Sequence, residues 1–205
     1  MVLVFASSCK KDKKTTPVSM TDKDGNVYTS VTIGTQTWLA ENLKTTKFNN
    51  GDSIPTTTAD VSAQSAPLYQ WAYNDTVNYA DIYGRLYTWY AATDSRNLCP
   101  TGWHVPSLAE WETLQSFLGG DSIAGGKLKE DGSAYWKSPN VGATNETGFT
   151  ALPGGYRSQH GAYYDLTASG WWWTSSDDAP LAWGQSLHFD NDSLVNWERG
   201  GRKPG

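Results

Sequence analysis

Histidine would be the natural base or metal ligand of a catalytic site, and the chain has three: His104, His160 and His188. Nucleophilic catalysis needs a serine, threonine or cysteine beside a base that a third group orients. None of the histidines lies in a G-x-S-x-G or H-E-x-x-H sequence, and they lack the short spacing of zinc ligands. The sequence therefore predicts no catalytic residues, no bound metal and no cofactor.

Carboxylates offer a second route to chemistry, because glycoside hydrolysis needs two of them at a set separation. The chain has 21 Asp and Glu residues, and no pair among them stands out. The best oxygen-rich cluster is residues 190–192, where Asp190 and Asp192 could bind Ca²⁺ or sugar hydroxyls. The same residues fit a hairpin turn, which is the preferred interpretation. Residues 22–26 are also interpreted as a turn, because they lack the terminal Glu of a calcium loop.

Aromatic side chains offer a third kind of site, since a sugar ring can stack on an exposed ring face. The chain has 11 Trp, 11 Tyr and 5 Phe. Most of the tryptophans are expected in the core, above all Trp38, Trp89, Trp103, Trp111 and Trp172. The aromatic candidates for a ligand-binding face are Tyr163, Tyr164, Trp183 and Trp197.

The N-terminus resembles the end of a bacterial lipoprotein signal. A short apolar run and three small residues precede Cys9, and four lysines follow between residues 10 and 14. In such proteins the cysteine becomes the acylated N-terminus and anchors a soluble domain in the bilayer. The apolar run is shorter than that of a full signal, so residues 1–9 are expected to be a partial signal and residues 10–22 a flexible tether. The alternative is an apolar N-terminus with an unmodified Cys9.

Composition narrows the class of protein. With 205 residues the chain suits one domain plus a tail, and its 13% aromatic content is too high for a disordered chain. Its formal net charge is −5, and its basic cluster lies in the predicted tether, which argues against nucleic-acid binding. No stretch approaches the 18 or more apolar residues of a membrane-spanning helix.

Local patterns predict the elements that would position these side chains. Turn signals and β-forming residues predict a hairpin over residues 27–40, followed by a long polar loop over residues 44–67. Apolar spacing predicts a short helix within residues 86–92. Ser107 and Glu110 have the spacing of a capping box and predict a helix that ends at the next glycine pair.

Beyond residue 120, strands and turns are expected to dominate. The glycine pairs at residues 125–126 and 154–155 are interpreted as turns, and Arg157 as a structural ion-pair or backbone-clamping residue. Regularly spaced β-rich segments between residues 148 and 197 predict an antiparallel meander. Helices early in the chain and strands late in it indicate an α+β fold.

The motifs, taken in order, resemble the Fibrobacter succinogenes major paralogous domain over roughly residues 23–205. The stretches that carry the resemblance are DGNVY (24–28), VTIGTQTWLAENL (31–43), YGRLYTWYAA (83–92), CPTGWHVPSLAEW (99–111), GFTALPGGYR (148–157) and WWTSS (172–176). Members of this family occur largely in secreted and lipid-anchored proteins of Bacteroidetes and their relatives, and the family has no established activity. The resemblance thus agrees with the interpretation of Cys9.

Residues 103–112, WHVPSLAEWE, also resemble a stretch of formylglycine-generating-enzyme-like domains. This resemblance implies a C-type-lectin-like architecture, with two short helices beside twisted antiparallel strands and long loops. The copper-binding cysteine pair of those enzymes is missing, because Cys99 is the only cysteine in the domain. Members of the paralogous family usually end in a strand whose cysteine would partner Cys99. The resemblance therefore implies that the domain is truncated at its C-terminus.

Together these observations predict a lipid-anchored module of the cell envelope, held in the outer membrane through acylated Cys9 on either its periplasmic or its surface side. We expect it to bind a glycan or an envelope protein, or to serve in adhesion, and to have no catalytic activity. The alternative is a polysaccharide-acting enzyme. Because the domain is acidic and is expected to be anchored in a membrane, we expect no nucleic-acid partner.

Overall fold

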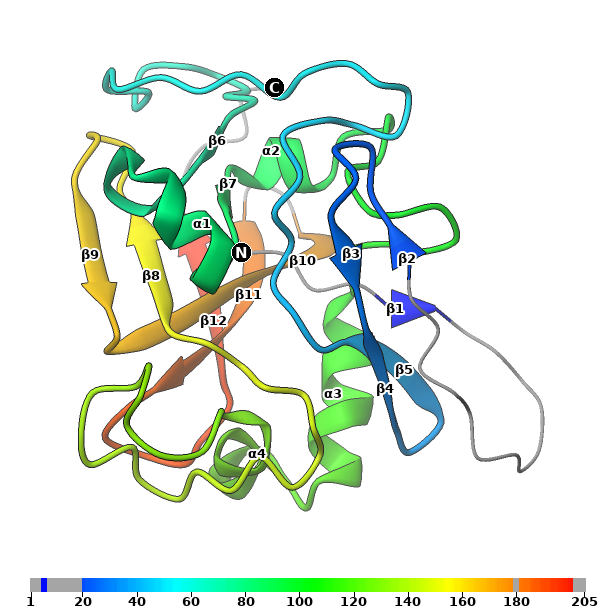
Figure 1. The fold of residues 1–205 in the computed structure, drawn as a ribbon, viewed down its shortest axis with the longest axis vertical. Helices are drawn as coiled ribbons and strands as arrows, with labels where there is room; N and C mark the ends of the chain where they lie inside the picture. Colours follow the sequence, from blue (N-terminus) through cyan, green and yellow to red (C-terminus); the bar gives the residue numbers. More distant parts are fainter. Residues whose placement is uncertain (1–4, 7–19, 179–180, 201–205) are drawn as a thin grey trace.

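The computed structural model describes residues 5–6, 20–178 and 181–200 and has an α+β fold, as predicted (Figure 1). The helical elements are η1 (Tyr73–Asp75), α1 (Val77–Tyr83), α2 (Trp89–Ala92), α3 (Leu108–Phe117) and α4 (Asp121–Leu128). The strands up to residue 87 are β1 (Phe5–Ala6), β2 (Met20–Thr21), β3 (Val27–Tyr28), β4 (Ser30–Ile33), β5 (Gln36–Leu39), β6 (Gln70–Trp71) and β7 (Leu86–Tyr87). The later strands are β8 (Gly154–Arg157), β9 (Tyr163–Leu166), β10 (Ser169–Asp178), β11 (Leu181–His188) and β12 (Val195–Gly200).

The largest sheet has the strand order β12-β11-β10-β8-β9. Strands β10, β11 and β12 form the predicted antiparallel meander. The meander does not extend to β8, because β10 pairs with β8 in parallel, with Gly170 opposite Gly155. The sheet is therefore mixed, because the β8–β10 pair is parallel whereas the other neighbouring strands are antiparallel. In Figure 1 this sheet lies to the left of α3 and the β4–β5 hairpin.

The predicted N-terminal hairpin is confirmed as β4 and β5, which join at Gly34 (φ +61°). A second pair, β2 with β3, comes before it, and β1 pairs with β5. Between β2 and β3 the Asp22 carboxylate accepts hydrogen bonds from the backbone of Asn26 and from the Tyr28 hydroxyl (2.6 Å), which confirms the turn over residues 22–26. Residues 20–22 were predicted to belong to the tether, but this pairing makes them part of the fold.

Helix α3 confirms the capping box. The Ser107 hydroxyl accepts from the backbone N–H of Glu110, whose carboxylate accepts from the backbone N–H of Ser107 at 2.7 Å. The helix predicted within residues 86–92 is wrong in its first half. Leu86–Tyr87 pairs with β6, and helix α2 begins only after Thr88, whose hydroxyl accepts from the backbone N–H of Ala91.

The glycine pair at residues 125–126 was predicted as a turn and instead lies inside helix α4. A Cβ on Gly125 would lie 2.3 Å from the carbonyl oxygen of Ser193, and one on Gly126 would lie 2.3 Å from that of Gly142. These glycines therefore serve close backbone packing against α4 rather than a change of chain direction. Helix α1 was not predicted either.

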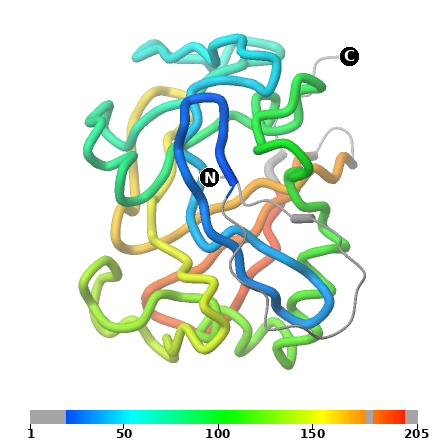
Figure 2. Tube along the Cα trace, turned by 45° about the vertical axis from the view of Figure 1, so that its right-hand side comes forward, coloured from blue at the N-terminus to red at the C-terminus, as the bar shows by residue number. Residues whose placement is uncertain are grey.

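The long loop over residues 44–67 has the predicted lack of strands, apart from a single bridge between Lys47 and Ser53. It nevertheless buries Phe48, Ile54 and Val61. In Figure 2 its cyan part runs along the top of the molecule. The loop is thus held by three apolar side chains, although its sequence is mostly polar.

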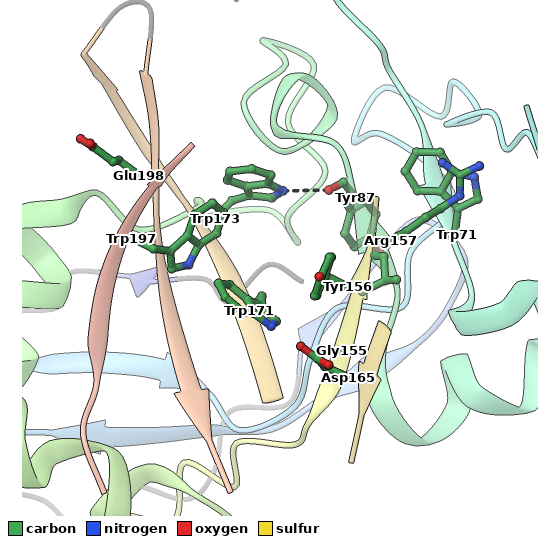
Figure 3. Close-up of a pocket in the computed structure, with 11 residues that line it drawn as sticks. Trp71, Tyr87, Gly155, Tyr156, Arg157, Asp165, Trp171, Trp173, Trp197 and Glu198 are labelled. Carbon is green, nitrogen blue, oxygen red and sulfur yellow. Dashed lines mark hydrogen bonds between the residues drawn. The ribbon is translucent and has the colours of Figure 1, made fainter. Parts of the chain in front are cut away.

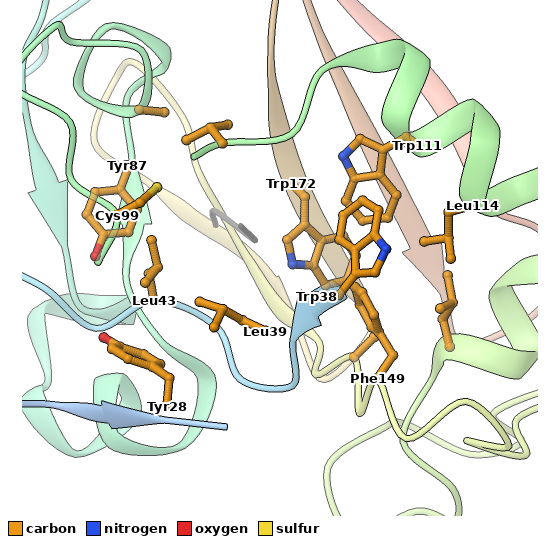
Figure 4. Packing of buried hydrophobic residues seen from close by; sticks show 14 of the residues in the cluster. Tyr28, Trp38, Leu39, Leu43, Tyr87, Cys99, Trp111, Leu114, Phe149 and Trp172 are labelled. Atoms are coloured by element: carbon orange, nitrogen blue, oxygen red, sulfur yellow. The ribbon is translucent and has the colours of Figure 1, made fainter. Parts of the chain in front are cut away.

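The core is aromatic at its centre (Figure 4). Trp38, Trp111 and Trp172 are at most 1% exposed, with ring centroids 4.8 Å apart for Trp38–Trp111 and 6.4 Å apart for Trp111–Trp172. Phe149 packs against the first two of these rings. These contacts join β5, α3 and β10 and confirm the prediction for these three tryptophans.

Two other tryptophans expected in the core are only half-buried. Trp103 packs against the core from its margin, and Trp89 donates its indole N–H to the carbonyl oxygen of Thr174. Cys99 lies inside the core with a free thiol, and burial raises its pKa. None of the helices in the described ranges is long and apolar enough to cross a bilayer.

Candidate ligand-binding site

A pocket of about 280 Å³ lies between the large sheet and the β6–β7 ribbon (Figure 3). The ribbon contributes Trp71, Leu86 and Tyr87. Strands β8 and β9 contribute Gly155, Tyr156, Arg157 and Asp165. Strands β10 and β12 contribute Trp171, Trp173, Trp197 and Glu198.

The three successive tryptophans of β10 divide between the two faces of the sheet. Side chains alternate along a strand, so Trp171 and Trp173 line the pocket while Trp172 enters the core on the opposite face. The Trp173 indole N–H donates to the carbonyl oxygen of Tyr87 at 2.8 Å and ties β10 to β7. Trp171 and Trp173 were not among the predicted site residues. The signal in the sequence was the run of three tryptophans at residues 171–173, because a strand with three in a row must present tryptophan on both faces of its sheet.

Trp197 reaches the same face from β12 by lying over a glycine. Gly184 of β11 pairs with both Trp173 and Trp197, and a Cβ on it would lie 2.3 Å from the Trp197 ring. With no side chain beneath it, the Trp197 ring contacts Trp171 and Trp173 at centroid distances of 5.3 and 4.8 Å. Its buried indole N–H has no hydrogen-bond partner among the described residues.

Two tyrosines continue these rings toward the other edge of the sheet. Tyr156 of β8 lies 5.6 Å from Trp171, and Tyr164 of β9 stacks on Tyr156 at 5.4 Å. Tyr164 is 46% exposed. We call Tyr164, Tyr156, Trp171, Trp173 and Trp197 the aromatic strip. The strip crosses the whole five-stranded sheet, with Gly184 as its step over β11.

Arg157 lines the pocket, but its hydrogen bonds stabilise the fold. Its side chain is buried and donates to the carbonyl oxygens of Ala59 (3.0 Å) and Ser158 (3.2 Å). Its guanidinium carbon also lies 4.3 Å from the centroid of the Trp71 ring. The predicted backbone-clamping role is therefore confirmed, and the guanidinium holds the loop of residues 44–67 against β8.

Residues 154–155 were predicted as a turn, but they lie in strand β8. Glycine is needed at position 155 because strand β9 approaches β8 closely there. A Cβ on Gly155 would lie 2.2 Å from the carbonyl oxygen of Tyr164. Asp165 follows with a left-handed backbone (φ +60°), a conformation that aspartate tolerates better than most residues. In Figure 3 the Asp165 carboxylate lies beside Gly155 at one end of the pocket, whereas the Glu198 carboxylate points away from the tryptophans.

The model of the Fibrobacter succinogenes major domain family matches residues 31–199. The chain belongs to this family. The resemblance predicted from the sequence motifs is thereby confirmed, and the match covers every residue of the aromatic strip. No curated protein matches the chain, and no solved structure matches it.

Within this Fibrobacter succinogenes major domain, the other predicted aromatic candidates lie apart from the pocket. The Tyr163 hydroxyl donates to the Asp75 carboxylate at 2.6 Å, and its ring packs on Tyr73 at 5.3 Å. Burial, together with Asp75, raises the pKa of Tyr163. Trp183 is half-buried in β11 and does not line the pocket. Cys9 lies outside the described residues.

Next to the segment of residues 190–192, the domain holds a buried ammonium. Lys129 is 0% exposed, and its Nζ donates to the carbonyl oxygens of Val141 (2.8 Å), His188 (3.0 Å) and Asn191 (2.8 Å). A lysine whose charge is removed from water needs such acceptors. Lys129 therefore joins the end of α4 to the end of β11 and to the segment that follows it.

Asp190 and Asp192 lie in the connection from β11 to β12, as the preferred turn interpretation predicted. Burial lowers the pKa of Lys129 to about 8, and the charges of Asp192 and Asp190 oppose that shift. Both aspartates thus act electrostatically on a lysine that the sequence did not single out. They do not line the aromatic pocket.

The histidines are separated in the structure as they are in the sequence. His104 contacts the capping carboxylate of Glu110 at 3.1 Å, and the exposed His160 contacts Asp60 at 2.9 Å. His188 lies edge-on to Trp171 at 5.5 Å. Across the described ranges, no group of three His, Cys, Asp or Glu side chains could hold a metal ion.

Proposed function

We propose that the aromatic strip and its pocket bind a glycan and that the domain is a binding module without catalytic activity. The observation that carries the proposal is the convergence of Trp171, Trp173 and Trp197 beside the Asp165 carboxylate. Indole faces stack on the C–H faces of sugar rings, and a carboxylate accepts hydrogen bonds from hydroxyl groups. Pockets for small molecules usually enclose about 300–1,000 Å³, and a volume of about 280 Å³, just below that range, suits a short stretch of a glycan.

Binding is favoured over hydrolysis by the orientation of the two carboxylates of the pocket. A glycosidase needs two carboxyl groups that flank the scissile bond, about 5–9.5 Å apart. Asp165 lies beside the rings, but Glu198 points away from them. A polysaccharide-acting enzyme is therefore the second candidate, and it is separated from a binding module by whether products are released.

A glycan array probed with the full-length protein, followed by titration calorimetry and a hydrolysis assay, tests this function. Trp171→Ala should lower the affinity for the bound glycan by about tenfold or more, equivalent to ~1.4 kcal/mol. Trp183→Ala is the matched control, because it removes a half-buried tryptophan of the neighbouring strand that does not line the pocket. Equal affinities for the two variants would reject the site, and released sugar would support the enzyme.

We further propose that Cys9 is acylated and holds the domain in the outer membrane of the cell envelope. The apolar run and small residues before Cys9 support this, as does the lysine-rich segment that follows it. Labelling cells with radioactive palmitate should mark the wild-type protein and not Cys9→Ala. Label retained in Cys9→Ala would contradict the assignment, and protease treatment of intact cells would distinguish the surface side from the periplasmic side.

A C-type-lectin-like architecture remains part of the proposal. It is supported by the WHVPSLAEWE stretch at residues 103–112 and by α3 and α4 beside twisted strands with long loops. Fold alone would not transfer a ligand or an activity, so the glycan proposal rests on the strip. Comparing the strand order of an experimental structure with that of C-type-lectin-like domains tests this part.

A further inference from the structure

We propose that the aromatic strip binds a single, extended chain of neutral sugars that runs across the strands, with its units along the pocket from Trp197 to Tyr156 and its outermost unit on Tyr164. This inference rests on the proposed glycan-binding function and defines its ligand: an uncharged oligosaccharide of several units. Free monosaccharides, charged glycans and crystalline polymer surfaces would not be ligands.

The length of the strip points to more than one sugar unit. From Tyr164 on β9 to Trp197 on β12, it crosses four interstrand steps of about 4.8 Å each, or roughly 19 Å. A sugar ring advances an extended glycan by about one such step. Four of the five strip residues line the pocket, so most of the chain would lie along the pocket and only its outermost unit would stack on Tyr164. The 46% exposure of Tyr164 leaves a ring face open at that end of the strip.

The ring orientations point to a single chain rather than a flat polymer surface. Tyr156 and Tyr164 are nearly parallel, with 26° between their planes, but Tyr156 and Trp171 differ by 69°. Trp197 is turned by 73° from Trp171 and by 53° from Trp173. Rings so far from coplanar cannot all lie on one crystal face, whereas a chain that rotates at each linkage can follow them.

The charges of the pocket point to an uncharged chain. The Arg157 guanidinium lines the pocket, but it is buried and its terminal N–H groups donate to the backbone carbonyls of Ser158 and Ala59. Asp165 is exposed and places negative charge at one end of the pocket. A glycan that carries carboxylate or sulfate groups would be repelled there.

The test is a chain-length series measured by calorimetry with the full-length protein. The probes are β-1,4-glucose, β-1,4-xylose, β-1,4-mannose and α-1,4-glucose oligomers of roughly one to six units, with crystalline cellulose as the flat surface. We expect at least one series to gain roughly 2- to 10-fold in affinity per added unit until the strip is filled at about four units. We expect no binding to the cellulose.

Tyr164→Ala should abolish the gain from the outermost unit and leave the affinity for the disaccharide unchanged. Tyr135→Ala is the control, since it removes a tyrosine of similar exposure (37%) that lies outside the strip. Thermal melts of both variants check that they fold. An affinity independent of chain length, or an equal loss in both variants, would overturn the inference.

Other outcomes separate this inference from the function on which it rests. Binding only of charged glycans on the array, or binding to crystalline cellulose, overturns the neutral single chain and leaves glycan binding intact. Binding of no saccharide at all overturns both.

Discussion

Gly184→Ala is the most direct test of how the aromatic strip is built. The new Cβ would lie 2.3 Å from the Trp197 ring and 2.7 Å from the carbonyl oxygen of Trp172. Since real Cβ atoms do not approach other atoms so closely, either the Trp197 ring or strand β11 must move. The ring is the end of a rotatable side chain, whereas the Trp172 carbonyl belongs to the neighbouring backbone. We therefore expect Trp197 to leave its place against Trp171 and Trp173.

The size of the effect follows from the contacts that are lost. Overpacking of this kind costs about 1–3 kcal/mol, and Trp197 gives up two ring contacts worth ~0.5–1.5 kcal/mol each. We expect the free energy of unfolding to fall by about 2–6 kcal/mol. In a chain of this length each kcal/mol shifts Tm by about 2–4 °C, so the loss should be about 4–24 °C. The Trp197 emission should also shift to the red as the indole becomes exposed to water.

A double-mutant cycle measured by urea denaturation separates the two clashes. In a Trp197→Ala background the ring is absent, so adding Gly184→Ala should cost less than half of what it costs in the wild type. An equal cost in both backgrounds would refute the assignment, because it would mean that the clash lies with the backbone of β10. The same variants should lose glycan affinity in proportion to the displacement of Trp197.

Three further predictions concern residues outside the strip. Lys129→Met leaves three buried carbonyl oxygens without their donor and should cost about 3–5 kcal/mol in urea denaturation, whereas Lys127→Met, which loses only a surface ion pair, should cost less than ~1 kcal/mol. Burial raises the pKa of Asp24, but hydrogen bonds from Thr46 outweigh it and leave the pKa below its usual value of about 3.9. The stabilisation is therefore complete above that value and is lost as pH falls through the lower folded pKa. Asp24→Asn should thus lower Tm at pH ~7, and its difference from the wild type should shrink as the pH falls below about 3.9. Cys99 should resist alkylation in the native protein and react in concentrated guanidinium chloride, as peptide mass spectrometry would show; fast labelling of the native protein would contradict its burial.

Local signals in the sequence predicted the elements that depend on neighbouring residues alone. The capping box of Ser107 and Glu110 lies within one helical turn, so its hydrogen bonds form wherever that helix forms. The hairpin of β4 and β5 likewise depends on the turn at Gly34 and on adjacent β-forming residues. For the same reason the turn over residues 22–26 was recognisable from its composition.

Glycines show where such local signals mislead. Gly125 and Gly126 look like a turn in sequence, but they lie in α4, where the backbones of Ser193 and Gly142 pack against the helix. Those partners are distant in the sequence. A glycine permits close approach as readily as it permits a turn, and only the partner decides which of the two is used.

The sequence by itself determined the family, the α+β class, the helix after Ser107 and the burial of the central tryptophans, because motif order, capping and apolar spacing are properties of the chain. The tertiary structure alone decided which aromatic residues form a surface. Tyr156, Trp171 and Trp197 come together only because β8 lies beside β10 and because Gly184 lets one indole pass over β11. Strand order and the space above a glycine arise from packing between distant segments, which no local pattern encodes.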